Sequence, residues 1–315
     1  MTEERKYSII AVVVIAGLLI APHVMYSVLV MKMLCFALFA SAFNLLLGYG
    51  GLLSFGHAAY YGSAAYVTAH AMKWWGVTAE VGLLLGAAAA AFLGLVFGWL
   101  AIRRSGIYFA MITLAFAQMI YFLALQLPFT GGEDGIQAVP RGYLFGLFSL
   151  RSDIVLYHFV LVVCLAGFYI VYRAVNSPFG QILKAIKENP DRATSLGYKV
   201  SHFKLAAFVL STTLSGVAGG LTALVFQLAS ISNVEWTMSG EVVLMTLLGG
   251  MGTMIGPVIG AGFVVWLQTY LAPYGAWLTI ILGAIFVICV LLFRRGIVGE
   301  LWYRNLIPGF PYRRE

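Results

Sequence analysis

Charged residues are scarce in this sequence. Asp, Glu, Lys and Arg make up 10% of the 315 residues, against roughly 25% in ordinary soluble domains. Long runs contain no charged residue at all: 81–102, 105–132, 205–234 and 242–293. This composition excludes a soluble globular domain. Because one membrane span needs about 20 apolar residues, the last run must contain more than one span.

Residues arranged to bind a metal or nucleotide, or to catalyse a reaction, are also lacking. The three cysteines, Cys35, Cys164 and Cys289, fall in separate apolar segments without metal-ligand spacing, so we interpret them as small buried hydrophobic side chains. The sequence has no GxxxxGK[ST] nucleotide-binding loop, no metal-binding cluster and no catalytic constellation. No series of Asp, Glu and His crosses an apolar segment, which argues against a proton-coupled mechanism. We therefore expect no enzyme activity, no catalytic residue, no metal and no cofactor, and any energy source must lie on another chain.

Hydrophobic residues dominate instead, at 62% of the chain, with a mean hydropathy of +0.94. They predict an all-α, polytopic helical membrane protein with about 8–10 transmembrane segments, because an outer-membrane barrel would show alternating segments of about 10 residues. The N-terminus has the basic flank and apolar core of a signal peptide but no small-x-small cleavage site before Ser27, so we interpret it as an uncleaved first helix. The candidate spans are 8–22, 26–47, 55–72, 80–102, 107–127, 154–172, 205–228, 241–254, 257–272 and 276–293.

The placement of charge predicts the orientation. Basic residues flank the spans, as interfacial lysines and arginines ordinarily do, so they do not indicate nucleic-acid binding. By the positive-inside rule they mark cytoplasmic segments, which places both termini in the cytoplasm. Several acidic residues lie elsewhere, including a pair in the loop 128–153, which we expect to be external. We interpret this loop as a plain connector; the alternative is a docking surface for a soluble partner. The basic clusters are 5–6, 103–104, 173–204 and 294–314.

Two stretches interrupt the apolar pattern with glycine and proline. Residues 44–66 contain five glycines, a histidine, two serines and an asparagine, and residues 249–257 read GGMGTMIGP. Glycine weakens a helix, and paired interrupted segments mark the central site of many transporters. Aligning the stretches places Gly48 with Gly249 and Gly51 with Gly252, a possible internal repeat. The alternative is that small residues only let helices pack closely.

The polar and small residues of these breaks are our candidates for a solute pathway. His57 is interpreted as a packing histidine in preference to a proton relay. Glu241 is placed either at the external mouth or inside the membrane, and Lys32 can snorkel toward the interface. The full candidate set is Asn44, Gly48, Gly51, Ser54, His57, Tyr61, Thr113, Gln118, Gly249, Gly250, Gly252 and Pro257.

Residues 173–204 form the longest charged segment. Its local signals predict two short cytoplasmic helices, the first capped by Ser177 before Pro178 and the second by Asn189, with Gly197 as its stop. The first helix is amphipathic, which fits a helix lying on lipid headgroups. We favour a docking element for a cytoplasmic protein, because the second helix is too polar to need lipid. The candidate docking residues are Glu188, Asn189, Pro190, Asp191, Arg192, Leu196 and Gly197.

Five blocks in a fixed order give the chain a specific resemblance. It resembles the permease subunits of branched-chain amino acid ABC importers, the Liv type and its LivM-like branch, over nearly its whole length. The resemblance therefore implies a single transmembrane permease domain, 1–315, in a bacterial inner membrane. The blocks are 44–66, 105–119, 130–136, 185–211 and 247–261.

The resemblance also implies partners. A second permease, usually a non-identical homologue, would complete the membrane core, two cytoplasmic ATPases would bind the ATP, and a periplasmic binding protein would deliver the solute. Segment 188–197 would be the coupling helix. Branched-chain or other hydrophobic amino acids are the expected solutes, with urea, short amides and aromatic acids as alternatives. A channel or secondary transporter that works without ATPases is the alternative of another class.

Overall fold

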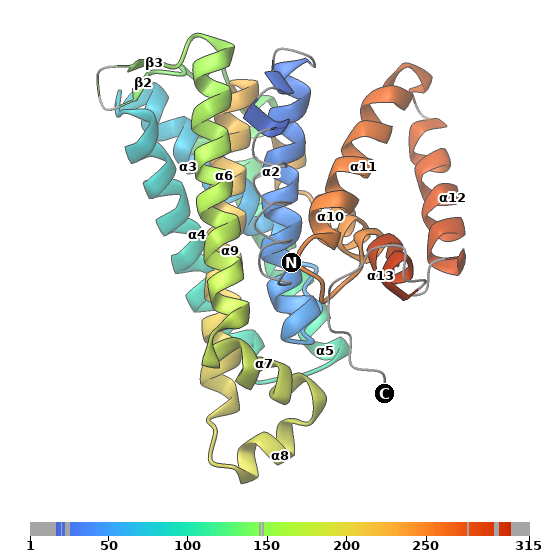
Figure 1. The fold of residues 1–315 in the computed structure, drawn as a ribbon. Helices are drawn as coiled ribbons and strands as arrows, with labels where there is room; N and C mark the ends of the chain where they lie inside the picture. Colours follow the sequence, from blue (N-terminus) through green and yellow to red (C-terminus); the bar gives the residue numbers. More distant parts are fainter. Residues whose placement is uncertain are drawn as a thin grey trace.

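The computed structural model describes residues 17–19, 21–22, 26–144, 146, 148–275, 277–292 and 296–303. Long helices run side by side along the molecule, and two short helices lie beyond one end of the bundle (Figure 1). The helices are α2 (Ser27–Asn44), α3 (His57–Trp74), α4 (Ala79–Ala101), α5 (Ile107–Gln126), α6 (Asp153–Asn176), α7 (Pro178–Glu188), α8 (Pro190–Ser195), α9 (Val200–Phe226), α10 (Trp236–Gly249), α11 (Gly256–Leu271), α12 (Trp277–Leu292) and α13 (Gly296–Tyr303).

The predicted fold class is confirmed. A helix occupies every predicted span from 26–47 onward, and the first predicted span, 8–22, lies largely outside the described residues. Some of these helices are both long and apolar enough to cross a membrane on their own. They are Ser27–Tyr49, Ala79–Ala101, Ile107–Gln126, Asp153–Asn176 and Val200–Phe226.

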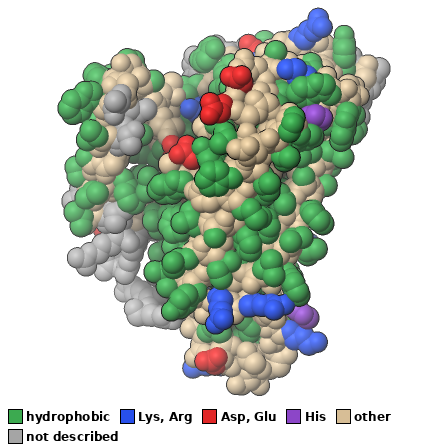
Figure 2. All heavy atoms as spheres, turned by 180° about the vertical axis from the view of Figure 1, so that it is seen from behind, with side chains coloured by type: hydrophobic (Ala, Val, Ile, Leu, Met, Phe, Trp, Pro, Cys, Tyr) green, Lys and Arg blue, Asp and Glu red, His purple; other side chains and the backbone are tan. Residues whose placement is uncertain are grey.

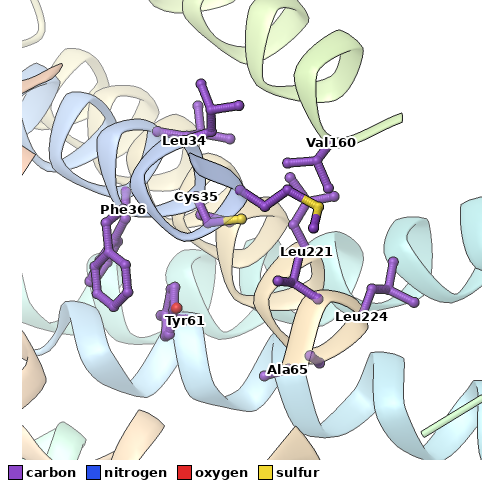
Figure 3. Close-up of a cluster of buried hydrophobic side chains, with 14 of the residues drawn as sticks. Leu34, Cys35, Phe36, Tyr61, Ala65, Val160, Leu221 and Leu224 are labelled. Atoms are coloured by element: carbon purple, nitrogen blue, oxygen red, sulfur yellow. The ribbon is translucent and has the colours of Figure 1, made fainter. Parts of the chain in front are cut away.

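The core of the bundle lies where α2, α3, α4 and α9 meet. In α2 and in α9, 78% of the most apolar part of the helix is buried inside the bundle. In α5 the corresponding share is 28%, so α5 is peripheral. Close approach depends on small residues: a Cβ on Gly219 of α9 would overlap the backbone of Tyr61 in α3. Figure 3 shows a part of the core where buried side chains of α2, α3, α6 and α9 pack together, among them Cys35, Tyr61 and Val160. Cys35 and Cys164 are buried free thiols, as predicted, and the side chain of Cys289 lies outside the described residues.

The two ends of the bundle differ. At one end, residues 127–152 contain short 3₁₀ turns and the strands β1 (Ile136–Gln137), β2 (Tyr143–Leu144) and β3 (Phe148–Ser149). Strand β2 pairs with β3, and β1 pairs with β4 (Leu228–Ala229), which follows α9; both pairs are antiparallel. At the other end lie α7 and α8. Figure 2 shows hydrophobic side chains over the middle of the molecule, basic ones near both ends, and most of the visible acidic ones toward the end opposite α8. This arrangement agrees with an external loop region opposite a cytoplasmic helical segment.

Candidate functional site

The first break separates α2 from α3. After Asn44 the helix continues as a π-helical turn, Leu45–Tyr49, and then ends. Gly51 has φ +67°, a backbone conformation that L-residues with a side chain rarely adopt, and the chain runs without helical structure to His57. Single π turns inside helices are frequent at functional sites. The interruption predicted from the glycines of this stretch is therefore present.

The second break separates α10 from α11 and has a similar form. Gly250 and Gly252 have φ +114° and +78°, and Pro257 stands in the first turn of α11, where its missing N–H is harmless. The hydroxyl of Thr253 donates to Gly250 O at 2.7 Å and accepts from Gly256 N–H at 3.1 Å. Positive φ at both Gly51 and Gly252 matches the alignment of the two stretches, although the internal repeat itself stays a prediction.

The two breaks touch each other through Asn44. Its Nδ2 donates to Thr253 O at 2.8 Å, and its Oδ1 accepts from Gly252 N–H at 2.8 Å. An added Cβ on Gly48 would lie 2.5 Å from the backbone nitrogen of Gly252, so only glycine permits this approach. The Asn44 side chain is 2% exposed, while Gly252 is exposed and Thr253 half-buried, so the two hydrogen bonds are part-buried. One amide side chain thus satisfies backbone groups that the second break leaves without helical partners.

The other polar candidates of the first break are packed inside the chain. His57 Nε2 lies 2.9 Å from Ser211 Oγ, which donates its one proton to Ala42 O at 2.6 Å. The hydroxyl must therefore accept from His57, so Nε2 carries the imidazole proton. No partner for Nδ1 is present among the described residues. These contacts agree with the interpretation of His57 as a packing histidine.

Hydrogen bonds also hold the remaining candidates. Tyr61 Oη donates to Thr222 Oγ1 at 2.7 Å, Thr113 Oγ1 accepts from Phe55 N–H at 3.2 Å, and Ser54 Oγ accepts from Gly56 N–H at 3.2 Å. Thr113 is buried and Gln118 is half-buried, as expected for residues on partly different sides of α5. The bond of Thr113 joins α5 to the first break, that of Tyr61 joins α3 to α9, and that of Ser54 lies within the first break. The role of these side chains in a solute pathway stays a prediction.

A hollow on the described surface lies elsewhere. It is an apolar space of about 490 Å³ between α4 and α9, and none of its lining residues belongs to either break. The lining residues are Leu95, His202, Leu205, Ala206, Val209, Leu210 and Thr213.

The two predicted cytoplasmic helices are present as α7 and α8. Asn189 Oδ1 accepts from Arg192 N–H at 2.9 Å and caps α8, as predicted. Gly197 has φ +89° and follows the end of α8, where its N–H and that of Tyr198 bond to carbonyls of the last turn. The predicted docking residues lie on the exposed side of this segment: Glu188, Asn189, Pro190, Asp191, Arg192, Leu196 and Gly197.

The prediction that the Ser177 side chain caps α7 is wrong. Ser177 occupies the N-cap position of α7, but its hydroxyl makes no cap hydrogen bond and instead donates to Ala174 O at 2.7 Å. The reason is that α6 ends at Asn176, immediately before α7, and its last carbonyls need donors. The amphipathic pattern of α7 is confirmed, because Leu183 and Ile186 are buried.

Helix α7 rests on the first break. The ammonium of Lys187 donates to Gly48 O at 2.7 Å, and the Lys184 ammonium lies 5.5 Å from the centre of the Tyr49 ring. Burial lowers the pKa of Lys187 below its ordinary value of 10.5, and the neighbouring Glu188 carboxylate opposes this change in part. Lys187 thus joins the segment carrying α8 to the first break, which contacts the second break through Asn44. Sequence reasoning missed it, because the lysine lies at the edge of an ordinary polar helix face.

We expect Lys187→Met to weaken this connection. Methionine keeps the apolar stem against Gly51 but removes the donor to Gly48 O, a charge-assisted bond of about 1.5–3 kcal/mol. Thermal unfolding in lipid nanodiscs should show a lower midpoint than for the wild type. The matched control is Lys199→Met at the exposed residue before α9, which should leave the midpoint unchanged. Equal unfolding midpoints for both variants would show that the bond from Lys187 to Gly48 does not stabilise the contact between α7 and the first break.

The family model and the similar proteins that match this chain name the same kind of protein. The family model described as "Branched-chain amino acid transport system / permease component" matches residues 24–291. The high-affinity branched-chain amino acid transport system permease protein LivM of Escherichia coli (strain K12) is 27% identical over 278 residues, which cover 81% of this chain and 65% of that protein. The chain therefore spans about two thirds of the length of this relative.

Other relatives have related names. The probable branched-chain amino acid transport permease protein LivH of Methanocaldococcus jannaschii is 28% identical over 130 residues, 41% of this chain and 40% of that protein. The autoinducer 2 import system permease protein LsrC of Salmonella paratyphi B is 26% identical over 252 residues, 74% of this chain and 69% of that protein. No solved structure matches the chain significantly.

Proposed function

This chain belongs to the branched-chain amino acid transport system permease family, and from that premise we propose that it is the membrane-spanning subunit of an ABC importer. It passes branched-chain or other hydrophobic amino acids from a binding protein on the outside to the cytoplasm. ATP hydrolysis in separate subunits drives the transfer. The observation that carries the proposal is the family match over residues 24–291, which includes both breaks and the segment with α7 and α8.

The geometry of α7 and α8 supports the ATP-driven part of the proposal. Helix α8 is short, capped and exposed, as a surface that docks into another protein must be. Through Lys187 and Gly48 it is joined to a pair of helix breaks that depend on few hydrogen bonds. A displacement of α8 by an ATPase can therefore be transmitted through α7 to the two helix breaks.

The remaining partners follow from the same proposal. The second permease is a homologue of this chain, and the ATPases, two in number, bind ATP, so this chain needs no cofactor of its own. The binding protein docks at the end of the bundle with residues 127–152. The chain resides in the bacterial inner membrane with both termini in the cytoplasm. The basic residues at the end of the bundle with α8 support this orientation.

The solute is the part of the proposal that needs an experiment. Because LsrC is named for autoinducer 2 import, the family as a whole is not confined to amino acids. Uptake into proteoliposomes should be measured for the complete complex with its binding protein and ATP. The panel contains leucine, isoleucine, valine, urea, a short amide and an aromatic acid. We expect ATP-dependent uptake of the three amino acids. Uptake of another solute alone would move the proposal to that solute, and uptake without ATP or ATPases would overturn the importer mechanism.

A further inference from the structure

Two opposite charges lie within apolar helices of the bundle, outside the two helix breaks described above. Lys32 is the single charged residue of α2, Glu241 is the single charged residue of α10, and α11 contains none. A charge inside a membrane span is costly, up to about 2.5–3.5 kcal/mol at the bilayer centre on insertion scales. Charged residues kept in such helices most often serve transport of a solute or ion.

Both residues lie near the external start of their helices. Lys32 is five positions after Ser27 and Glu241 is five positions after Trp236, so each lies ~7.5 Å below the external start of its helix. Helix α2 packs against both α10 and α11, which brings the two side chains to one region. The external side is the side away from α7, where β4 leads toward α10 and pairs with the external loop.

The two charged groups interact electrostatically but do not pair. The field of each acts on the other, yet no Lys32–Glu241 contact within 4.0 Å is present, and among the described residues the recorded ion pair is that of Arg141 with Asp153. Glu241 Oε2 accepts from Gln268 Nε2 at 3.1 Å, which holds the carboxylate in place. The Lys32 ammonium lies 5.9 Å from the centre of the Phe36 ring and makes no hydrogen bond within the described part of the chain.

Both charged side chains are only partly buried, unlike the buried polar residues of the first break. A solute can therefore reach them. Below Lys32 the interior is aromatic, because the buried Phe36 of α2 lies beside the buried Tyr61 of α3, with ring centres 6.1 Å apart (Figure 3). A separated cation and anion in otherwise charge-free helices are complementary to a molecule that carries both charges on one carbon atom and an apolar side chain.

From this geometry we propose that Lys32, Glu241 and Gln268 form a binding station for the zwitterionic head of an α-amino acid. Lys32 binds the carboxylate of the solute, and Glu241, oriented by Gln268, binds its ammonium group. The zwitterion completes both charge pairs, so the station lowers the desolvation cost of bringing the solute into the membrane. This inference rests on the proposed function and deepens it, since it assigns the substrate class to particular side chains.

Binding of three probes to the complete transporter tests the station. The purified complex in lipid nanodiscs, without binding protein, is titrated with L-leucine, with 4-methylpentanoate, which lacks the ammonium group, and with 3-methylbutylamine, which lacks the carboxylate. The wild type should bind L-leucine at least ten-fold more tightly than either analogue. Lys32→Gln should weaken L-leucine and 4-methylpentanoate and leave the amine unchanged. Glu241→Gln should weaken L-leucine and the amine and leave 4-methylpentanoate unchanged.

Because each substitution should weaken binding of a different analogue, the result distinguishes the loss of one binding contact from general unfolding. Lys73→Gln is the matched control, because Lys73 lies at the external end of α3 and its ammonium donates to Gln137 O. It should leave binding of all three probes unchanged. Equal weakening of both analogues by each substitution, or no binding of L-leucine by the wild type, would overturn the station. Leucine uptake by the wild-type complex tests the proposed function separately, so the station can fail while the importer assignment holds.

Discussion

Replacing Gly48 with alanine is expected to force the two helix breaks apart. The new Cβ would lie 2.5 Å from the backbone nitrogen of Gly252 and would also overlap Oδ1 of Asn44. A backbone atom cannot turn away as a flexible side chain can, so α2 or the loop after α10 must move. Overpacking costs about 1–3 kcal/mol, and each interhelical hydrogen bond of Asn44 that is lost adds about 0.6–1.7 kcal/mol.

The expected result is a loss of several kcal/mol in unfolding free energy and of most uptake activity. Thermal unfolding in nanodiscs and uptake in proteoliposomes measure the two effects. Gly262→Ala is the control, because it adds the same methyl group to α11 at a position with nothing within 4 Å. Asn44→Ala is the second variant, since it removes both bridging bonds without adding bulk. If both variants unfold and transport like the wild type, contact between the breaks is not needed.

Substitutions in α8 are expected to uncouple ATP hydrolysis from uptake. Arg192→Ala removes an exposed cation from the proposed docking surface, and Gly197→Ala strains the stop of α8 by about 1–2 kcal/mol, because Gly197 has φ +89°. Neither change alters a buried contact: nothing lies within 4 Å of the position of a Cβ on Gly197. The protein should therefore insert and fold normally while uptake falls at least ten-fold and ATPase subunits dissociate more readily.

Two matched substitutions separate docking from general damage. Arg104→Ala removes an exposed arginine at the same end of the bundle but in the turn between α4 and α5. Gly76→Ala introduces the same backbone strain at the opposite end, where φ is +64° and space is open. Both should retain uptake and ATPase association. Wild-type uptake and undiminished ATPase association in both α8 variants would show that the ATPases dock elsewhere.

Signals confined to a few residues predicted the structure well. Asn189 and Gly197 define the ends of α8 through bonds to residues at most four positions away, and such bonds need no tertiary context. The helix breaks were predictable for the same reason, because glycine acts on its own backbone. Ser177 shows the limit of local reasoning: its hydroxyl had two possible partners, and the end of the preceding helix determined which one it took.

Contacts between distant segments were not predictable. The bond from Lys187 to Gly48 spans 139 positions and the bond from Asn44 to Thr253 spans 209. No periodicity or cap signal relates such residues. Lys32 is the clearest case, since its position in an apolar segment suggested only a snorkelling side chain. The packing of α2 against α10 and α11, which brings Glu241 near, gives that lysine its proposed role.

The contact between Asn44 and the second break also constrains how the protein is made. Gly252 follows Asn44 by 208 positions, so at a synthesis rate of 5–20 residues per second the amide waits roughly 10–40 s for its partners. During that interval α2 lies in the membrane with a polar side chain at its inner end and no second break to receive it. The chain up to the second break is therefore an assembly intermediate in which Asn44 lacks its final partners, and synthesis of the second break supplies them.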